Sequence, residues 1–451
     1  MLKKLLLSLS ILTAICISIT PVPAKAAAFN IDFATNSAAI ELVNMDTDTI
    51  VYQKSSAERR EPASTTKIMT YIIVSEHIKD LDGTKITVSK SVVNKLLGTG
   101  SSLSGIKEND VLTAYQLLNC MLVPSGNDAA LVLADYVGNG DVDAFVEMMN
   151  QKAKELGCTG THFANPHGLH DDDHYTTASD LAKITKYAMS LPHFTDISSQ
   201  TRYTYKPAGG PDAAKNRTLS TTNYLIDKNA LGGKYFYTYA RGIKTGHHDQ
   251  SGYCLVSSAT AYGYTYLCVA LGSPDIDKNG KEIASRGEMI DTANLFRWAF
   301  LNLELKPILN GQDSVGEIKL NNAWNKDKLL LIAGKNYSAM LPKNVSTSSV
   351  IITKDIPGSI DAPVKKGQKV GTATLSYANQ KLATVDLIAS ESVERSELLS
   401  SANLVKSIFT SVWFLAIVGL IVLLVVIYII LALIYNRKKK NLRKVKKYRK
   451  M

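Results

Sequence analysis

The chain has 451 residues and a formal net charge of +11. Ten lysines and arginines lie between Arg437 and Lys450, and three more lysines lie in the first 26 residues, which leaves about −2 for the rest of the chain. Because the positive excess is confined to the two ends, the charge does not support nucleic-acid binding by the folded part.

A secretory signal peptide is predicted for residues 1–26. Two lysines at the start precede an apolar stretch from Leu5 to Ile19, and Ala24-Lys25-Ala26 supplies a small-residue cleavage pattern. This apolar stretch is shorter than a membrane-spanning helix and is followed at once by the cleavage pattern, as in signal peptides. We therefore expect the mature chain to begin near Ala27.

Residues 27–275 are predicted to form one α+β domain. Apolar runs at Ala39–Asn44 and Thr49–Gln53 are separated by turn residues, and strand patterns return only at Tyr253–Ser258 and Tyr264–Leu271. The segments between them have helical periodicity at Thr65–Lys79, Thr113–Leu122, Asp128–Val137, Val142–Leu156 and Ala178–Leu191. This order predicts an antiparallel sheet built from distant segments, which carries a helical subdomain. Residues 205–240 are expected to be irregular.

A second, smaller domain is predicted after a connecting helix. The segment 276–305 contains a helical pattern from Ser285 to Leu305. Residues 306–392 are short alternating runs separated by turn signals such as Pro357-Gly358, which predicts an all-β domain. Residues 393–410 are expected to form a linker.

One membrane-spanning helix is predicted at residues 411–435, which contain no charged residue. About 25 residues at 1.5 Å each give roughly 37 Å, enough to cross a hydrocarbon core of ~30 Å. The basic segment 436–451 follows, and the positive-inside rule places such a tail in the cytoplasm. We therefore expect a single-pass protein of the cell membrane with its body outside, and the tail is available to contact anionic lipid.

The first motif with catalytic chemistry is Ser64-Thr65-Thr66-Lys67, preceded by Pro62. Proline is favoured at the start of a helix, where backbone N–H groups are unpaired, so the Ser64 hydroxyl is expected at the positive end of a helix. Lys67 falls on the same helix face. A neutral Lys67 could take the serine proton if burial and a second cation lowered its pKa from about 10.4 to near 7. Lys244 is the candidate cation.

A second motif, Ser125-Gly126-Asn127, follows Pro124, which interrupts a helical run and predicts a loop between two helices. In that loop the Ser125 hydroxyl could relay a proton to a leaving amine. The Asn127 amide could hold the two lysines or a substrate carbonyl.

A third motif, Lys244-Thr245-Gly246, precedes an apolar strand pattern. An edge strand can pair with a peptide substrate, lysine and threonine can bind a terminal carboxylate, and Gly246 allows close approach to the backbone. Each of the three motifs is weak by itself. Together and in this order, in a chain predicted to be secreted, they indicate a serine acyl-transfer enzyme.

The motifs and their surroundings resemble the low-molecular-mass penicillin-binding proteins of the D-alanyl-D-alanine carboxypeptidase family, which share their fold with serine β-lactamases. The resemblance is carried by EPASTTKIMT around Ser64, MLVPSGNDAALVLAD around Ser125, ANPHGLH at residues 164–170 and GIKTGHHDQSGYCLVSSA around Lys244. It implies a β-lactamase/transpeptidase-like catalytic domain. Residues 306–392 resemble the small β domain that follows the catalytic domain in these carboxypeptidases.

This resemblance implies a role for each matching residue. The catalytic residues would be the nucleophile Ser64, the base Lys67 and the proton relay Ser125. The substrate-binding residues would be Asn127, Lys244, Thr245, Gly246 and His247, with the N–H groups of Ser64 and His247 as the oxyanion hole. The expected reaction removes the terminal D-alanine of peptidoglycan stem peptides through an acyl-enzyme, and β-lactams would acylate Ser64 and leave slowly.

Three further groups of residues could form sites. The histidines and aspartates between His162 and His174 resemble metal ligands, but Pro166 and Gly168 indicate a loop, so we predict no metal and no cofactor. His248 and Asp249 are expected beside the cleft without a catalytic role. The four cysteines after the signal peptide lack metal-site spacing, and although Cys254 and Cys268 could face each other, we expect buried thiols.

Three alternative functions use the same motifs. A β-lactamase would need a second base for the water that attacks the acyl-enzyme, and the sequence indicates none. A β-lactam sensor would need an effector domain, whereas only the short basic tail is expected inside the cell. A D,D-endopeptidase shares all three motifs, and the β-rich second domain favours a carboxypeptidase.

Overall fold

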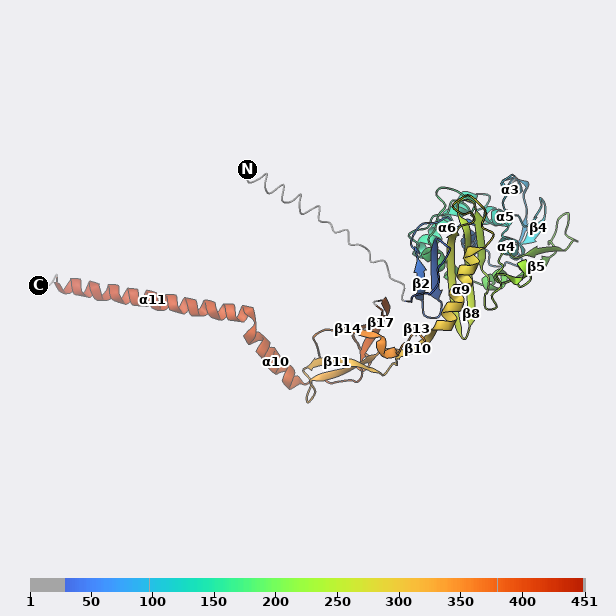
Figure 1. Ribbon diagram of the computed structural model, residues 1–451. Helices are drawn as coiled ribbons and strands as arrows, with labels where there is room; N and C mark the ends of the chain where they lie inside the picture. The colour runs from blue at the N-terminus through green and yellow to red at the C-terminus, as the bar shows by residue number, and fades with distance from the viewer. Residues whose placement is uncertain (1–28, 97, 379, 449–451) are drawn as a thin grey trace. The chain divides into compact units, whose positions relative to one another are not determined.

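The computed structural model describes residues 29–96, 98–378 and 380–448 (Figure 1). The predicted signal peptide at residues 1–26 lies outside the described residues. The chain divides into two compact units. The first contains the described residues up to Lys306 together with Ser338–Val350 and Ser376–Leu382, and the second contains Pro307–Tyr337, Ile351–Leu375 and the chain from Ala383 onward.

The first unit is built on a five-stranded antiparallel sheet in the order β2-β1-β9-β8-β7. The strands are β1 (Ala39–Asn44), β2 (Thr49–Lys54), β7 (Lys244–His248), β8 (Gly252–Ala261) and β9 (Tyr264–Ser273). Strands from both ends of the domain therefore pair with each other, which confirms the predicted α+β fold.

Alternating side chains of β9 face two different layers. Leu267, Val269 and Leu271 pack into the helical core on one face of the sheet. Tyr266 and Cys268 pack into a second core on the opposite face. This period of two is the expected pattern for a strand buried on both sides. The sheet therefore lies between two layers of helix.

The helical layer surrounds α2, whose residues from Lys67 to Val74 are all buried. A helix that is apolar nearly all round belongs in the centre of a core. The helices of this unit are η1 (Ala63–Thr66), α2 (Lys67–His77), α3 (Lys90–Asn94), α4 (Ala114–Leu122), α5 (Asn127–Val137), α6 (Val142–Glu155), α7 (Ala178–Ala188), α8 (Phe194–Ser198), η2 (Ala230–Gly233) and α9 (Gly287–Asn302). The five helical segments predicted between the strands correspond to α2, α4, α5, α6 and α7.

The helix predicted as a connection, α9, is also a layer of the first unit (Figure 1). Its residues Leu295, Phe296 and Ala299 are fully buried against the second face of the sheet. The predicted irregular segment 205–240 is mostly irregular, but it contains β6 (Arg217–Ser220), which pairs with β5 (Arg202–Tyr205), and the short η2. A further small antiparallel pair joins β3 (Lys85–Thr87) and β4 (Val111–Thr113).

The four cysteines in the described part of the chain are free and buried, as expected. Cys254 and Cys268 lie on the neighbouring strands β8 and β9, but Cys268 stands opposite Ser257 in the register. Cys254 packs in the helical core and Cys268 packs with α9. The two side chains therefore lie on opposite faces of the sheet, so the suggestion that they could face each other was wrong.

The second unit is built on a six-stranded sheet in the order β14-β16-β17-β12-β11-β15. A separate pair joins β10 and β13, most of whose residues belong to the first unit. Leu329 and Leu331 of β12 are fully buried, while Lys328 before them and Leu330 between them are exposed. The predicted all-β domain is confirmed. The strands are β10 (Leu303–Leu309), β11 (Ser314–Asn321), β12 (Lys328–Ala333), β13 (Tyr337–Pro342), β14 (Ile351–Asp355), β15 (Ser359–Asp361), β16 (Lys369–Tyr377) and β17 (Gln380–Ala389), and a 3-10 turn, η3, covers Thr347–Ser349.

Two helices end the described chain. The segment predicted as a linker, 393–410, is largely helical, because α10 covers Glu397–Thr410. The next helix, α11, covers Val412–Tyr448, and its part Val412–Lys438 is the one helix in the described residues that is long and apolar enough to cross a membrane. The 27 residues of this part give about 40 Å of helix.

Candidate active site

Three distant segments meet at the edge of the five-stranded sheet. Strand β7 passes so close to η1 that a Cβ atom added at Gly246 would lie 3.0 Å from the Ser64 nitrogen and 2.9 Å from the Pro62 oxygen. The loop 164–170 approaches the same turn from another direction, because a Cβ at Gly168 would lie 1.9 Å from the Ala63 oxygen. The backbone around Ser64 is therefore held from two sides.

Lys67 lies directly beneath Ser64. It is the first residue of α2, its side chain is fully buried, and its Nζ atom is 2.8 Å from Ser64 Oγ. The same nitrogen donates to Asn127 Oδ1 at 2.6 Å and to the His167 carbonyl oxygen at 2.7 Å. The sequence motifs indicated Ser64 and Asn127 as neighbours of this lysine, but they did not indicate the carbonyl of His167.

Burial holds the pKa of Lys67 well below its usual range, and the charge of Lys244 lowers it further. Burial also lowers the pKa of Lys244, to about 7. The negative charge of Asp128 acts in the opposite direction on Lys67. Lys67 is therefore disposed to be neutral near physiological pH, and the expected effect of Lys244 on the pKa of Lys67 is present.

The second motif lies in the loop between α4 and α5, as predicted. Ser125 is buried and has a φ of 68°, a conformation that few residues other than glycine adopt. Beyond it, the buried carboxylate of Asp128 accepts hydrogen bonds from the backbone N–H groups of Ser104 and Gly105. Asp128 thereby fixes the 99–106 loop to the start of α5, a role that sequence reasoning missed.

The third motif forms β7, which is an edge strand of the sheet. Lys244 is buried and donates to the Thr245 carbonyl oxygen at 2.8 Å. The Thr245 hydroxyl lies 2.5 Å from that of Thr222, a residue that no motif indicated. The His247 ring stacks on Tyr253 with ring centroids 4.2 Å apart.

These segments surround a cavity of about 630 Å³. Six of the eight predicted site residues line it, and Lys67 and Lys244 are buried in the protein around it. The lining residues that sequence reasoning did not single out include Ser101, Ser102, Thr222, Tyr224 and Arg286. The six predicted ones are Ser64, Ser125, Asn127, Thr245, Gly246 and His247.

The histidines of the 162–174 segment lie in a loop, as predicted. His174 is buried; its Nδ1 atom accepts the Ala164 N–H, so its Nε2–H donates to Thr66 Oγ1 at 2.7 Å. Burial lowers the pKa of both His167 and His174 to about 3, which keeps them neutral. Within residues 29–96, 98–378 and 380–448, no three His, Cys, Asp or Glu side chains are arranged to hold a metal ion.

A serine–lysine pair at the start of a central helix, with a Ser-x-Asn loop and a Lys-Thr-Gly edge strand around one cavity, is the arrangement of penicillin-interacting serine enzymes. Comparison with known proteins agrees with this class. A sequence model of the D-alanyl-D-alanine carboxypeptidase family matches residues 24–275, and one of the penicillin-binding protein 5 C-terminal domain matches residues 304–395.

Individual relatives cover most of the chain. The D-alanyl-D-alanine carboxypeptidase DacF of Bacillus subtilis is 28% identical over 82% of this chain and 89% of its own length, and DacC of Escherichia coli is 30% identical over 76% and 81%. The crystal structure of penicillin-binding protein 5 from Haemophilus influenzae aligns with a TM-score of 0.63 and 25% identity, over 81% of this chain and all of that one. The chain therefore belongs to the D-alanyl-D-alanine carboxypeptidase family. It is a serine-type D-Ala-D-Ala carboxypeptidase of the penicillin-binding protein 5 type.

Proposed function

We propose that Ser64 is the nucleophile of this carboxypeptidase and that Lys67 is its base. The three contacts of the lysine nitrogen support this assignment. A neutral amine has two N–H groups and one lone pair. Two of its three partners, Asn127 Oδ1 and the His167 carbonyl oxygen, accept hydrogen bonds, which leaves the lone pair for the Ser64 hydroxyl at 2.8 Å.

The remaining site residues bind the substrate and move its proton. The N–H groups of Ser64 and His247 stabilise the oxyanion, and Lys244 and Thr245 bind the terminal carboxylate. Ser125 relays the proton to the leaving amine, Asn127 orients Lys67, and Gly246 lets the substrate backbone approach β7. The single observation that carries the proposal is the buried contact between Lys67 and Ser64.

The proposed substrate is a peptidoglycan stem peptide that ends in D-Ala-D-Ala. Ser64 Oγ attacks the carbonyl carbon of the penultimate D-alanine and gives its proton to Lys67. The amide bond breaks, the terminal D-alanine leaves with a proton delivered through Ser125, and water then hydrolyses the ester. A β-lactam would acylate the same oxygen by opening of its ring, and its ester would be hydrolysed slowly. The names of the relatives support both ligands.

This proposal is tested on the full-length protein in detergent. We expect the release of one D-alanine from a peptide that ends in D-Ala-D-Ala and no release from the same peptide ending in D-Ala-L-Ala. Incubation with a fluorescent penicillin followed by mass spectrometry of proteolytic fragments should locate one adduct on Ser64. An adduct on any other residue would refute the assignment of the nucleophile.

We also propose a topology for the chain at the cell membrane. Residues 27–275 would carry the reaction, 276–305 would connect them to a β-rich stalk at 306–392, and the span at 411–435 would anchor the body outside. The excess of lysine and arginine at 436–451 supports a cytoplasmic tail. The side chains from residue 439 onward lie outside the described residues.

Cysteine labelling checks this topology, because the four native cysteines in the described residues are buried. A membrane-impermeant thiol reagent should label Glu394→Cys in intact protoplasts, since residue 394 is exposed and precedes the span. It should label Asn441→Cys only after lysis. The opposite pattern would overturn the proposed orientation.

A further inference from the structure

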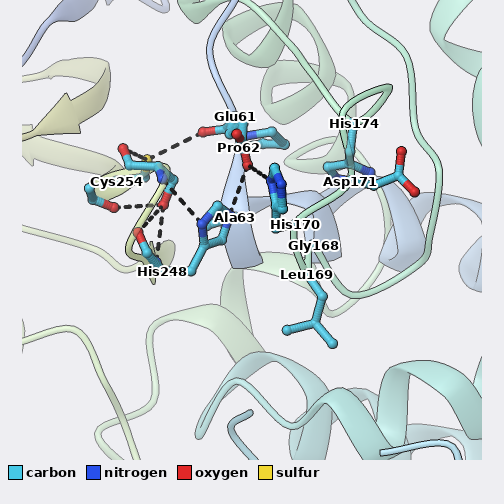
Figure 2. Close-up of polar contacts among 12 residues, drawn as sticks. Glu61, Pro62, Ala63, Gly168, Leu169, His170, Asp171, His174, His248 and Cys254 are labelled. Atoms are coloured by element: carbon cyan, nitrogen blue, oxygen red, sulfur yellow. Dashed lines mark hydrogen bonds and ion pairs between the residues drawn. The ribbon is translucent and has the colours of Figure 1, made fainter. Parts of the chain in front are cut away.

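Next to the catalytic contacts, one carboxylate lies between two imidazole rings. Glu61 Oε2 is 2.9 Å from His170 Nδ1 and 3.3 Å from His248 Nε2 (Figure 2). The side chains of Glu61 and His248 are largely buried, with 25% and 16% exposed, and 39% of the His170 side chain is exposed. None of the three takes part in the reaction as described so far.

The backbone fixes which nitrogen of His248 carries the proton. The Ser251 N–H donates to His248 Nδ1 at 3.1 Å, so Nδ1 is an acceptor and the proton of a neutral ring is on Nε2. That Nε2 atom lies 3.3 Å from Glu61 Oε2. Burial lowers the pKa of His248, in agreement with a neutral ring.

The pKa of His170 is shifted in the opposite direction to that of His248. The Nδ1–H of His170 donates to Glu61, and its Nε2 atom is 3.9 Å from Asp172 Oδ1. The hydrogen bond to Glu61 raises the pKa of His170, and the charges of Asp171 and Asp172 add to this effect. One oxygen of Glu61 therefore accepts a hydrogen bond from His170, whose ring favours the charged form, and lies 3.3 Å from Nε2 of the neutral His248 ring.

Each of the three residues belongs to a different stretch of the active site. Glu61 precedes Pro62 and stands three residues before Ser64. His170 ends the loop whose His167 carbonyl accepts from Lys67. His248 follows His247, the proposed oxyanion donor, at the end of β7.

Two imidazoles and a carboxylate also suggest a metal site. Within the part of the chain that the structure describes, however, no three His, Cys, Asp or Glu side chains are arranged to hold a metal ion. The contacts are instead those of a structural tie between three segments.

We propose that Glu61, His170 and His248 form a clamp that positions the serine turn, the 164–170 loop and the end of β7 for acylation of Ser64. The backbones it joins are already in close contact at Gly246 and Gly168, so a small displacement would change the distances around Ser64. The three residues are positioning residues, because they act through Ser64, Lys67 and His247. This inference rests on the proposed roles of those residues.

The test is made on the full-length protein and compares two replacements of His170 whose side chains have the same shape. Asparagine places an amide N–H where the Nδ1–H of histidine was, and leucine places a methyl group there. We expect His170→Leu to lower the rate constant for acylation by penicillin by about 10- to 100-fold, because misplacement of reacting groups by less than 1 Å has effects of this size. His170→Asn should recover most of the wild-type rate.

Each acylation rate is normalised to the amount of protein that penicillin labels at completion, so that unfolded protein does not contribute. Glu61→Gln should also slow acylation, since its neutral amide oxygen is a weaker acceptor for the protonated His170 ring than the carboxylate, and it decides the question if His170→Leu does not fold. Glu58→Gln is the control, because Glu58 is an exposed carboxylate paired with Arg60 outside the site. Its rate should equal that of the wild type.

Two outcomes would overturn the clamp. The first is equal acylation rates for His170→Asn and His170→Leu. The second is a wild-type rate per labelled site in Glu61→Gln and His170→Leu, with only the amount of folded protein reduced. In both cases mapping the adduct keeps the two proposals apart: an adduct on Ser64 leaves the proposed nucleophile intact, whereas an adduct elsewhere refutes that assignment.

Discussion

Lys67→Arg should lower the rate constant for acylation of Ser64 by about 10²- to 10⁴-fold, the range that a general base contributes. The guanidinium group stays protonated at every accessible pH and cannot accept the serine proton. It would also have to fit among three oxygen atoms that lie 2.6 to 2.8 Å from the present nitrogen. The change therefore introduces a permanent positive charge and removes the basic function.

The rate constant for acylation by penicillin, measured from pH 5 to pH 9, checks this expectation. Protonation of Lys67 removes its lone pair, so the wild-type rate should fall as the pH is lowered through the depressed pKa of this lysine. The arginine variant should show no such fall. Lys79→Arg, at an exposed position just after α2, is the matched control and should acylate normally. A fast Lys67→Arg variant would show that another group is the base.

Gly168→Ala should both destabilise the fold and slow acylation. Gly168 has a φ of +88°, and its added Cβ atom would lie 1.9 Å from the Ala63 oxygen and 2.9 Å from the Ser64 nitrogen. The left-handed conformation costs an alanine about 1–2 kcal/mol, and relief of such a clash costs a further 1–3 kcal/mol or so. Relief of the clash moves either the backbone of the nucleophile or the 164–170 loop, whose His167 carbonyl oxygen accepts from Lys67, so we expect acylation to fall by about 10²-fold.

A second variant, Gly140→Ala, separates the cost of the left-handed conformation from the effect of the clash. Gly140 has the same φ of +88°, but a Cβ atom there would meet nothing within 4 Å. Its variant should lose only the conformational part of the stability, measured by chemical denaturation, and should acylate at the wild-type rate. Equal losses in both variants would show that the contact between Gly168 and the serine turn is unimportant.

Local patterns predicted the secondary structure well because they record which face of each segment is buried. The alternation in Tyr264–Leu271 corresponds to a strand with two different cores on its faces, and the helical pattern after Ser64 corresponds to α2. The segment 393–410 was different. Its residues were assigned to a linker, although Ser396 caps a helix by accepting the Leu399 N–H.

The roles of single residues were harder to predict when a contact depends on the folded chain. Thr222 and the His167 carbonyl lie far in sequence from Thr245 and Lys67, and no spacing rule connects them. The clamp was missed for the same reason, since His170 was considered only as a metal ligand and His248 only as a neighbour of the cleft. The opposite faces of Cys254 and Cys268 required the strand register.

Neighbouring residues were enough to predict the order of the three motifs, the α+β and all-β units and the long apolar segment near the end. The protonation state of Lys67, in contrast, depends on the folded chain. The pKa of that amine depends on burial by residues from several helices and on the charge of Lys244, which the chain brings near only when β7 pairs at the edge of the sheet. Desolvation and distance between charges are properties of the folded protein, and they convert a common serine–lysine spacing into a reactive pair.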